Sequence, residues 1–345
     1  MSASQTWWFV GDLHLDTRPE PRGTGAAFAA FVHELAGSQH TARHLVLLGD
    51  TFELVRHREA AARLREIAVA HADAFAALRA AVRHGVHVHF VCGNHDAALA
   101  RPDVAGVLLS LLGHPSQGVA VHAWALAAPG AFYCEHGHQH HEVHRVATLL
   151  SQQESLWAEW LADRSGGVGR RAMSFLRATA GVPRRERAAR SPAYLARLDE
   201  EALRIGLTAQ AVRDLAQTSA VKVAPALARV GWRVLSRRVS ASRPYGLRPA
   251  AARVHRILRR HGSGVPTVLF AHTHRAEDTS LAQATGRYVN VGTWSADVRG
   301  AGPDGADPDL FPYARIVMRT GEAATATLRY WRRIPAHRTV ARHPA

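Results

Sequence analysis

Residues 86–96 have the sequence Val-His-Val-His-Phe-Val-Cys-Gly-Asn-His-Asp, an apolar run that ends in residues able to turn the chain or bind a metal. A short run rich in β-branched and aromatic side chains, closed by Gly93, predicts a buried strand. Asn94, His95 and Asp96 follow directly. The stretch therefore predicts a strand whose carboxyl end carries chemically useful side chains.

Four other apolar runs have the same design. They are 7–10 before Gly11-Asp12-Leu13-His14, 44–48 before Gly49-Asp50, 131–134 before Glu135-His136-Gly137-His138, and 267–270 before Ala271-His272-Thr273-His274. Segments with helical spacing of apolar residues lie between them, at 25–36, 57–84 and 103–112. Alternating strands and helices predict an α/β fold with a mainly parallel sheet, in which ligands bind beyond the carboxyl ends of the strands.

The pattern changes after residue 138. Residues 141–261 show no strand pattern and instead predict helices at 143–164, 170–180, 191–205, 208–217, 221–240 and 248–260. We interpret this segment as a helical insertion whose last helix belongs to the core, because it leads directly into the run 267–270. Strand patterns resume at 288–292, 311–318 and 325–331. The expected organisation is a core at 1–140 and 262–331, an insertion at 141–261 and a tail at 332–345.

Most of the positive charge lies in this insertion. The chain of 345 residues has 43 Lys and Arg against 28 Asp and Glu, a formal charge of +15. Residues 141–261 hold 22 Arg and one Lys against nine acids, which leaves the rest of the chain close to neutral. The hydrophobic content of 47% is ordinary for a globular protein and excludes collagen-like or wholly disordered chains. Anionic partners are therefore expected at the insertion.

Two interpretations of the insertion remain open. Trp157, Trp160, Phe175 and Trp232 are interleaved with its arginines, and 221–239 combines basic and apolar residues. Such a mixture could hold a pyrophosphate and a bulky apolar group, or rest on anionic lipid as an interfacial helix. It could equally be a helical cap whose aromatic side chains form a small core of their own while the arginines face water.

The cysteine content and the N-terminal sequence give an expectation for the cellular compartment of the protein. Cys92 and Cys134 both lie in predicted buried strands and are too few for a disulfide framework, so we expect reduced core residues. The N-terminus has no basic region, and its apolar stretch at 7–10 is too short for a signal peptide. No run approaches the ~20 apolar residues that cross a bilayer. We expect a cytoplasmic protein, which the basic insertion could bring to the periphery of a membrane.

The polar residues at the strand ends suit a metal site. Asp, His and Asn offer oxygen and nitrogen ligands for divalent Mn, Fe, Zn and similar ions. A helix cap or a turn would explain one block alone, whereas five blocks in order at strand ends favour a metal centre. His87 and His89 form another close pair, which we attribute to the two-residue repeat of one strand face. For the four histidines of 138–144, a solvated helix start is preferred over a third metal site.

The order Asp-x-His, Gly-Asp, Gly-Asn-His-Asp, His-Gly-His and x-His-Thr-His resembles that of the calcineurin-like binuclear metallophosphoesterases, over about residues 6–140 and 262–331. The resemblance implies a four-layer α-β-β-α sandwich that holds two divalent metal ions, with Mn²⁺ favoured and Fe, Zn, Ni or Co as alternatives. It also implies seven metal ligands, which are Asp12, His14 and His274 for one ion, Asp50 as the bridge, and Asn94, His136 and His272 for the other ion. By the same resemblance, His95 would protonate the leaving oxygen, Asp96 would orient His95, and a hydroxide bound at the binuclear centre would attack phosphorus.

Departures from the family pattern narrow the expected substrate. Gly49-Asp50 continues as Thr51-Phe52-Glu53, unlike the acidic-Arg-Gly sequence of the serine/threonine protein phosphatases, and the coiled-coil insertion of the repair nucleases is not evident. The form Gly-Asp-x-Phe-Glu and the helical insertion resemble the UDP-2,3-diacylglucosamine pyrophosphohydrolase branch, which usually has Arg at the position of His95. Ala271 replaces the usual glycine before His-Thr-His. Asn290, within the segment 288–294, either contacts the site or serves a turn.

The expected function is hydrolysis of a phosphoester or pyrophosphate bond, with the substrate selected by the basic insertion. Suitable substrates are phosphorylated small molecules, nucleotide-linked compounds and lipids. The first alternative is a nucleotide or nucleic-acid phosphodiesterase, although nucleic acid is the less favoured partner because the charge accompanies a predicted metal centre. The second is a non-catalytic scaffold that docks on a membrane or a protein. It ranks lower because every expected ligand position holds a suitable residue.

Overall fold

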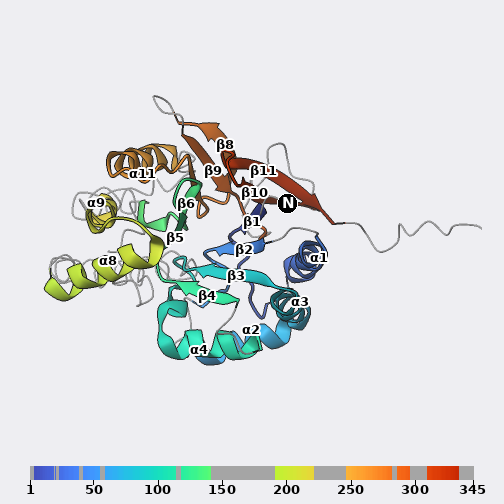
Figure 1. Cartoon of the computed structure of the whole chain (residues 1–345). Helices are drawn as coiled ribbons and strands as arrows, with labels where there is room; N and C mark the ends of the chain where they lie inside the picture. Colours follow the sequence, from blue (N-terminus) through green and yellow to red (C-terminus); the bar gives the residue numbers. More distant parts are fainter. Residues whose placement is uncertain are drawn as a thin grey trace, which may run out of the picture.

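The computed structural model describes residues 4–18, 20, 23–38, 42–54, 59–113, 118–140, 191–220, 246–281, 286–295 and 309–333 (Figure 1). The elements up to residue 140 are β1 (Ser4–Val10), α1 (Thr24–Ala36), β2 (Ala42–Leu48), α2 (Ala60–Ala70), α3 (Ala72–Arg83), β3 (Val86–Val91), η1 (Ala97–Ala100), α4 (Pro102–Leu111), β4 (Val119–His122), β5 (Ala125–Ala128), β6 (Phe132–Glu135) and η2 (His138–His140). Those that follow are α8 (Pro192–Ile205), α9 (Ala209–Ala220), α11 (Arg248–Arg260), β7 (Thr267–Phe270), β8 (Ala276–Ser280), β9 (Arg287–Val291), β10 (Leu310–Arg319) and β11 (Thr325–Arg332). Among these helices, none combines the length and the apolar character needed to cross a bilayer.

The first sheet has six strands in the order β11-β10-β1-β2-β3-β4. Strands β1 to β4 run parallel, and the hairpin of β10 and β11 joins antiparallel to β1. Leu48, the last residue of β2, pairs with Val91, the last residue of β3, and Val10 ends β1 beside Leu47. The loops after these three strands therefore all begin at the same end of the sheet, where the carboxyl ends of the strands lie.

The second sheet has five strands in the order β5-β6-β7-β9-β8. Its central strands β6, β7 and β9 run parallel, whereas β5 and β8 lie antiparallel at the two edges. Strands β4, β5 and β8 were not expected from the sequence. Each has only four or five residues, and β8 has the polar sequence Ala-Glu-Asp-Thr-Ser, so none offers a long apolar run.

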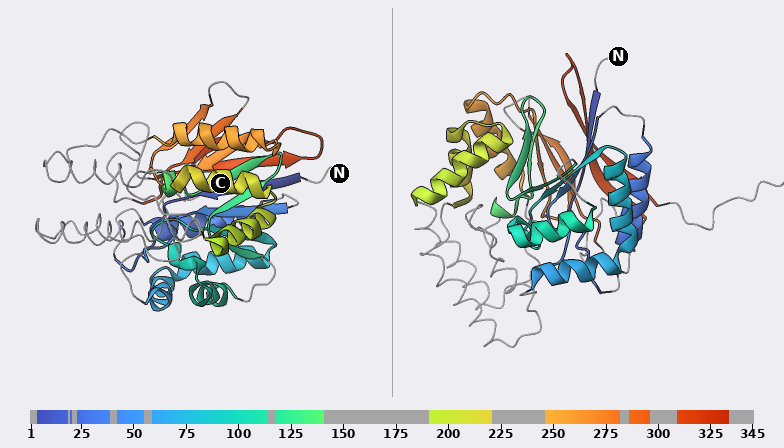
Figure 2. Two further views of the ribbon diagram at one scale, coloured as in Figure 1. Left: turned by 90° about the vertical axis from the view of Figure 1, so that its left-hand side faces the viewer. Right: turned by 60° about the horizontal axis from the view of Figure 1, so that its bottom comes forward.

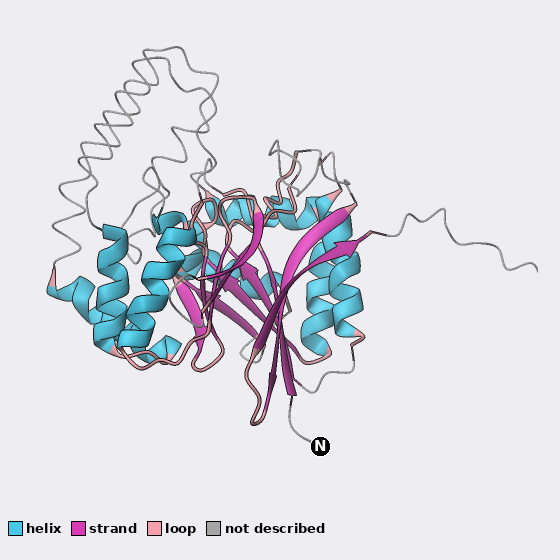
Figure 3. Ribbon diagram, turned by 90° about the horizontal axis from the view of Figure 1, so that it is seen from above, coloured by secondary structure: helices cyan, strands magenta, loops and turns pink. Residues whose placement is uncertain are grey.

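Helices cover the outer faces of the two sheets, which gives four layers in the order α-β-β-α (Figure 3). Helices α1 to α4 pack on the first sheet around buried side chains such as Phe28, Leu64 and Phe75. Between the sheets lies a second apolar core that includes Phe9, Phe132 and Leu269. The α/β sandwich expected from the sequence is confirmed, and its sheets are mixed rather than purely parallel.

The outer layer of the second sheet comes from residues that the sequence assigned to the insertion. Helices α8, α9 and α11 match the predicted helices at 191–205, 208–217 and 248–260, and they lie side by side (Figure 2). Their buried side chains pack on Tyr133 and Val268 of the sheet. The predicted helices at 143–164, 170–180 and 221–240, with Trp157, Trp160, Phe175 and Trp232, lie outside the described residues. The division into core and insertion stays a prediction.

Both cysteines are buried without a disulfide, in agreement with the sequence-based expectation. Cys134 lies in the core between the sheets, and Cys92 lies under the helices of the first sheet.

Candidate metal centre

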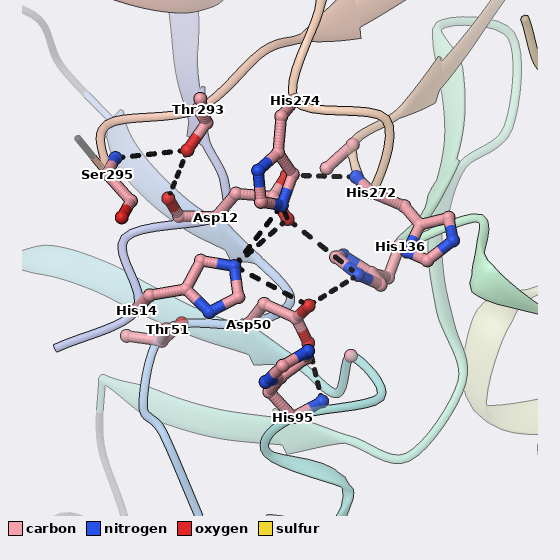
Figure 4. Close-up of polar contacts among 12 residues, drawn as sticks. Asp12, His14, Asp50, Thr51, His95, His136, His272, His274, Thr293 and Ser295 are labelled. Atoms are coloured by element: carbon pink, nitrogen blue, oxygen red, sulfur yellow. Dashed lines mark hydrogen bonds and ion pairs between the residues drawn. The ribbon is translucent and has the colours of Figure 1, made fainter. Parts of the chain in front are cut away.

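The five sequence blocks meet at one end of the sandwich. Asp12 and His14 follow β1, Asp50 follows β2, Asn94 and His95 follow β3, His136 follows β6, and His272 and His274 follow β7. These strands belong to both sheets, and the loops at their carboxyl ends face one another across the gap. Figure 4 shows the carboxylates of Asp12 and Asp50 surrounded by imidazole rings from the other loops.

The backbone of these loops is unusual in a way that coincides with the expected ligands. Among the described residues, the only residues other than glycine with positive φ are five expected metal ligands: Asp12 (51°), His14 (50°), Asp50 (51°), His272 (67°) and His274 (59°). The left-handed conformation is costly for residues with a Cβ and persists where the surrounding structure enforces it. The concentration of this strain in five candidate ligands is typical of a functional site.

Two glycines allow the loops to come close enough. A Cβ built on Gly49 would lie 2.3 Å from the ring of His136, and one on Gly93 would lie 2.1 Å from Oδ1 of Asp50. Both positions therefore need glycine for close approach between neighbouring loops. Gly49 and Gly93 therefore allow neighbouring loops to pack closely, in addition to allowing the chain to turn.

One group of potential ligands contains Asp12, His14 and His274. Oδ1 of Asp12 lies 3.1 Å from Nε2 of His274 and 3.7 Å from Nε2 of His14, and the two Nε2 atoms are 3.3 Å apart. Ligand atoms held about 2.0 to 2.2 Å from one zinc-like ion have separations of this order. The three side chains expected to hold one ion are thus brought together.

The second group contains Asp50, His136 and His272. Nε2 of His136 lies 3.2 Å from Oδ2 of Asp50, and the same oxygen is 3.8 Å from Nε2 of His14 in the first group. Asp50 therefore lies between the two groups, in the place expected for a bridging carboxylate. Asn94 is in the loop whose His95 N–H donates to Oδ1 of Asp50 at 2.7 Å.

The hydrogen bonds of these side chains leave one atom of each available for a metal. Oδ2 of Asp12 accepts from the backbone N–H of His272 at 2.9 Å, whereas its Oδ1 is buried without a hydrogen bond. Nδ1 of His136 donates to the carbonyl of Leu48 at 2.9 Å, which directs Nε2 inward. That Nε2 and Oδ1 of Asn94 are also buried and lack hydrogen bonds within the described part of the chain. Orphaned polar atoms of this kind fit a site for cations.

The charges of the centre balance one another. Burial would raise the pKa values of Asp12 and Asp50, but nearby histidines hold both pKa values well below the ordinary range, with His274 the main one for Asp12 and His136 the main one for Asp50. Burial would lower the pKa of His136, but Asp50 and Asp12 raise that pKa to about 9. The carboxylates are therefore ionised and strongly attract positive charge, which the neighbouring histidines or divalent ions can supply.

The segment after β9 holds the backbone of the ligand loops. Thr293 Oγ1 donates to the carbonyl of Asp12 at 2.8 Å. Nδ2 of Asn290 donates to the carbonyl of Ala271 at 2.8 Å, immediately before His272, and its Oδ1 accepts from the N–H of Gly292 at 3.0 Å. Of the two roles considered for Asn290, the structure therefore shows the one in a turn, where this side chain also supports the loop that carries His272.

Sequence reasoning assigned no role to Glu53, yet its carboxylate contacts the expected proton donor. Both oxygens of Glu53 lie 2.9 Å from Nδ1 of His95, and Oε2 lies 3.4 Å from Nδ1 of His14. Burial would raise the pKa of Glu53, but the two histidines hold it well below the ordinary value. The sequence feature that could have predicted this contact is the motif Gly-Asp-x-Phe-Glu, in which Glu53 follows Asp50 by three residues.

Asp96 lies beside this pair but contacts other atoms than expected. Its two oxygens accept hydrogen bonds from the backbone N–H groups of Thr51 and Gly93, each at 2.7 Å. Burial and repulsion by Asp50 raise the pKa of Asp96 to about 6. In the described structure Glu53, rather than Asp96, hydrogen bonds to the ring of His95, and Asp96 joins the loops after β2 and β3.

Comparisons with known proteins agree with this site. The model of the calcineurin-like phosphoesterase family matches residues 6–177, which include the first four blocks. Since these blocks and the fifth build one centre of buried His and Asp clusters, the chain belongs to the calcineurin-like metallophosphoesterase superfamily and is a hydrolase of that class.

A comparison with solved structures found, among others, two proteins to which this chain is similar. A predicted phosphoesterase from Streptococcus pneumoniae is 10% identical, with 95% of this chain and 100% of that chain covered and a TM-score of 0.30. Phosphopantetheinyl hydrolase from Mycobacterium tuberculosis is 13% identical, with 89% and 100% covered and a TM-score of 0.31. A search among curated proteins found no match.

Proposed function

We propose that the protein hydrolyses a phosphoester or pyrophosphate bond at a centre of two divalent metal ions. The observation that carries the proposal is the position of Asp50 between two groups of ligands, one with His14 and one with His136. When bound, such ions lower the pKa of a water molecule and neutralise the charge of the phosphoryl group. The ligand assignments are Asp12, His14 and His274 for one ion and Asn94, His136 and His272 for the other, with Mn²⁺ as the first metal to test.

The residues of the chain itself supply proton handling and orientation. His95 lies against His14, with ring centroids 4.7 Å apart, and its Nδ1 is held by Glu53. This arrangement leaves Nε2 of His95 to serve the leaving oxygen. His95 is about a quarter exposed, so its ring can reach a substrate. In this proposal, Glu53 positions His95 and Asp96 fixes the loop from which His95 projects.

The test is metal-dependent hydrolysis of bis(p-nitrophenyl) phosphate and p-nitrophenyl phosphate. We expect activity with Mn²⁺ that is abolished by a chelator and restored by the metal. A double variant, Asp50→Ala with Asn94→Ala, should lose both activity and bound metal, whereas His87→Ala, an exposed histidine on β3, should retain both. Activity that survives in the double variant would refute the assigned centre.

The basic helical segment is proposed to select the substrate. Its likeness to the UDP-2,3-diacylglucosamine pyrophosphohydrolase branch, together with Gly-Asp-x-Phe-Glu, supports a pyrophosphate or lipid-linked substrate, although His95 replaces the Arg of that branch. Cytoplasmic location and contact with an anionic membrane belong to the same proposal. Co-sedimentation with anionic liposomes, with and without residues 141–261, tests the membrane contact.

One observation favours a nucleic-acid phosphodiesterase as a second candidate. The exposed face of α11 carries Arg253, Arg256, Arg259 and Arg260, and within the described ranges none of them forms an ion pair. An unpaired row of guanidinium groups suits a polyanion. A nuclease assay at increasing salt tests this candidate, because binding driven by phosphate contacts weakens steeply with salt.

A further inference from the structure

Helix η2 places His138 beside the metal centre and buries both His138 and the adjacent Gln139. It begins two residues after the ligand His136, and His138 and Gln139 are only 3% and 1% exposed. The helix is fixed in place, because His140 hydrogen bonds to Glu135, whose other oxygen accepts from the indole of Trp124. The positions of His138 and Gln139 are therefore set by the fold.

These two side chains have hydrogen-bonding groups that nothing in the described chain uses. Nδ1 of His138 and both amide atoms of Gln139 are buried without a hydrogen bond. Buried polar groups in folded proteins are almost always satisfied, because each unsatisfied group is costly. Groups other than those of the described residues are therefore expected to donate and accept hydrogen bonds at this place.

The imidazole of His138 lies beside a different ligand group from the one that His95 contacts. Its ring centroid is 5.5 Å from that of His136 and 6.3 Å from that of His272, both in the second ligand group. The ring of His95 instead lies against His14, in the first group. Asp50 lies near His14 of the first group and near His136 of the second, so the rings of His95 and His138 flank the centre beside different groups.

The two flanking histidines also differ in their partners. His95 is hydrogen bonded to the carboxylate of Glu53, an arrangement that helps an imidazole to hold and deliver a proton. No carboxylate of the described residues hydrogen bonds to His138, and its neighbour Gln139 offers a neutral amide. The end at His95 suits a leaving oxygen, and the end at His138 suits neutral ester, hydroxyl or amide groups.

We infer that His138 and Gln139 bind the substituent that remains on phosphorus after cleavage, so that the substrate is a phosphodiester or a pyrophosphate diester rather than a monoester. The inference rests on the proposed function, since it assigns the two ends of the same centre. A monoester places a group at the His95 end only and leaves the hydrogen-bonding groups of η2 unused. A diester extends to both ends and satisfies them.

The test compares the manganese-loaded full chain with His138→Ala, Gln139→Ala and the control His87→Ala. Bis(p-nitrophenyl) phosphate serves as the diester and p-nitrophenyl phosphate as the monoester. We expect kcat/KM for the diester to fall about 10-fold in the first two variants, mainly through KM, with the monoester changed less than about 2-fold. His138→Gln, which keeps a hydrogen-bonding group, should recover part of the loss.

Two further measurements keep the outcomes distinct. Calorimetric binding of diphenyl phosphate should weaken by the same factor in His138→Ala, and metal content should stay at the wild-type value. Equal losses for both substrates, or unchanged diester binding, would overturn the inference and indicate that water fills the site. A lower metal content would show His138 to be a ligand and would also overturn it.

The binding measurement separates this inference from the proposed function. A wild-type protein that cleaves neither substrate but binds diphenyl phosphate through His138 would refute the proposed function alone. A wild-type protein that neither cleaves nor binds the diester would refute both.

Discussion

Both carboxylate oxygens of Glu53 lie 2.9 Å from Nδ1 of His95, although 42 residues separate the two in the chain. Glu53 lies in the segment after β2 and His95 lies in the segment after β3, so two adjacent parallel strands bring the two residues together. The same carboxylate also reaches His14 at 3.4 Å. Glu53 therefore links the proton donor of the proposed reaction to one side of the metal centre.

Replacement of Glu53 by Gln should slow catalysis while leaving the centre assembled. We expect kcat to fall between about 10- and 100-fold, because an amide orients His95 but no longer stabilises its protonated form. The loss should be greater for a phenyl ester than for a p-nitrophenyl ester, since the better leaving group needs less protonation. Steady-state kinetics with both esters measure the difference, and Glu66→Gln, an exposed glutamate on α2, is the control. An equal loss with both esters would contradict this role.

Replacement of Asp96 should act mainly on stability. Its carboxylate accepts two backbone N–H groups at 2.7 Å in a fully buried position, so Asp96→Ala leaves both donors unsatisfied. We expect a loss of about 2 to 4 kcal/mol in the free energy of unfolding, with a smaller loss for Asp96→Asn, which keeps one acceptor oxygen. Urea denaturation of the metal-free proteins measures these values. Full stability in Asp96→Ala would show that the two hydrogen bonds contribute little.

Glu53 and Asp96 illustrate how far the sequence predicts this site. Within each sheet, the convergence of the blocks followed from physics that is local in sequence, because apolar runs form strands and neighbouring parallel strands end on the same side. Which carboxylate turns toward His95 depends on side-chain directions in loops from two strands. The adjacent Asp96 was the natural candidate, but backbone N–H groups of the neighbouring loop take up both of its oxygens.

Prediction of the fold from the sequence was limited in the same way, because it succeeded only where the side-chain pattern is local and strong. Long apolar strands such as β1, β2 and β3 and the helices of both outer layers were predicted, because their side-chain periodicity is strong. Strand β8 was not, since the sequence Ala-Glu-Asp-Thr-Ser has no apolar pattern and pairs with β9 only because the chain returns to the edge of the sheet. The left-handed backbone of the ligands was also beyond prediction, because residues other than glycine seldom adopt this conformation.

His274 has a left-handed backbone conformation, with a φ of 59°. Glycine adopts this conformation at no steric cost, whereas alanine pays for its Cβ. In the metal-free state, we expect His274→Gly to be more stable than His274→Ala by about 1 kcal/mol, the reverse of the usual order. Both variants should bind less metal. The same pair of substitutions at Val69, an exposed residue of α2, is the control, and there alanine should be the more stable.

A row of histidines crosses the inner face of the first sheet and ends at a guanidinium group. Arg204 of α8 hydrogen bonds to Nδ1 of His122, Nε2 of His122 lies 3.1 Å from Nδ1 of His89, and Nε2 of His89 lies 3.2 Å from Nδ1 of His44. Because a guanidinium only donates, Nδ1 of His122 must accept, and its Nε2 then donates to His89. The same logic continues to His44, so Arg204 sets the tautomer of all three rings.

All three histidines in this row are held neutral. Burial, reinforced by Arg204, lowers the pKa of His122 to about 2. Burial and the neighbouring His44 lower the pKa of His89 to about 3, and burial with His87 lowers the pKa of His44 to about 4. Protonation of any ring would also remove an acceptor that the row needs. The folded state therefore binds fewer protons here than the unfolded state, whose histidines titrate near 6.5.

Because the row is neutral in the folded protein, it makes the folded protein less stable as the pH falls. The contribution of the row to stability is complete above pH 6.5 and is lost as the pH falls toward 4, by at most about 1.4 kcal/mol per pH unit for His89 and for His122 and by less for the more exposed His44. His89→Leu removes one such group, so the variant should lose stability less steeply than the wild type between pH 6.5 and 4.5. Chemical denaturation of the metal-free proteins measures the slopes, and His33→Leu, at an exposed position of α1 away from the row, should keep the wild-type slope. Identical slopes for His89→Leu and the wild type would mean that the row is protonated in the folded protein.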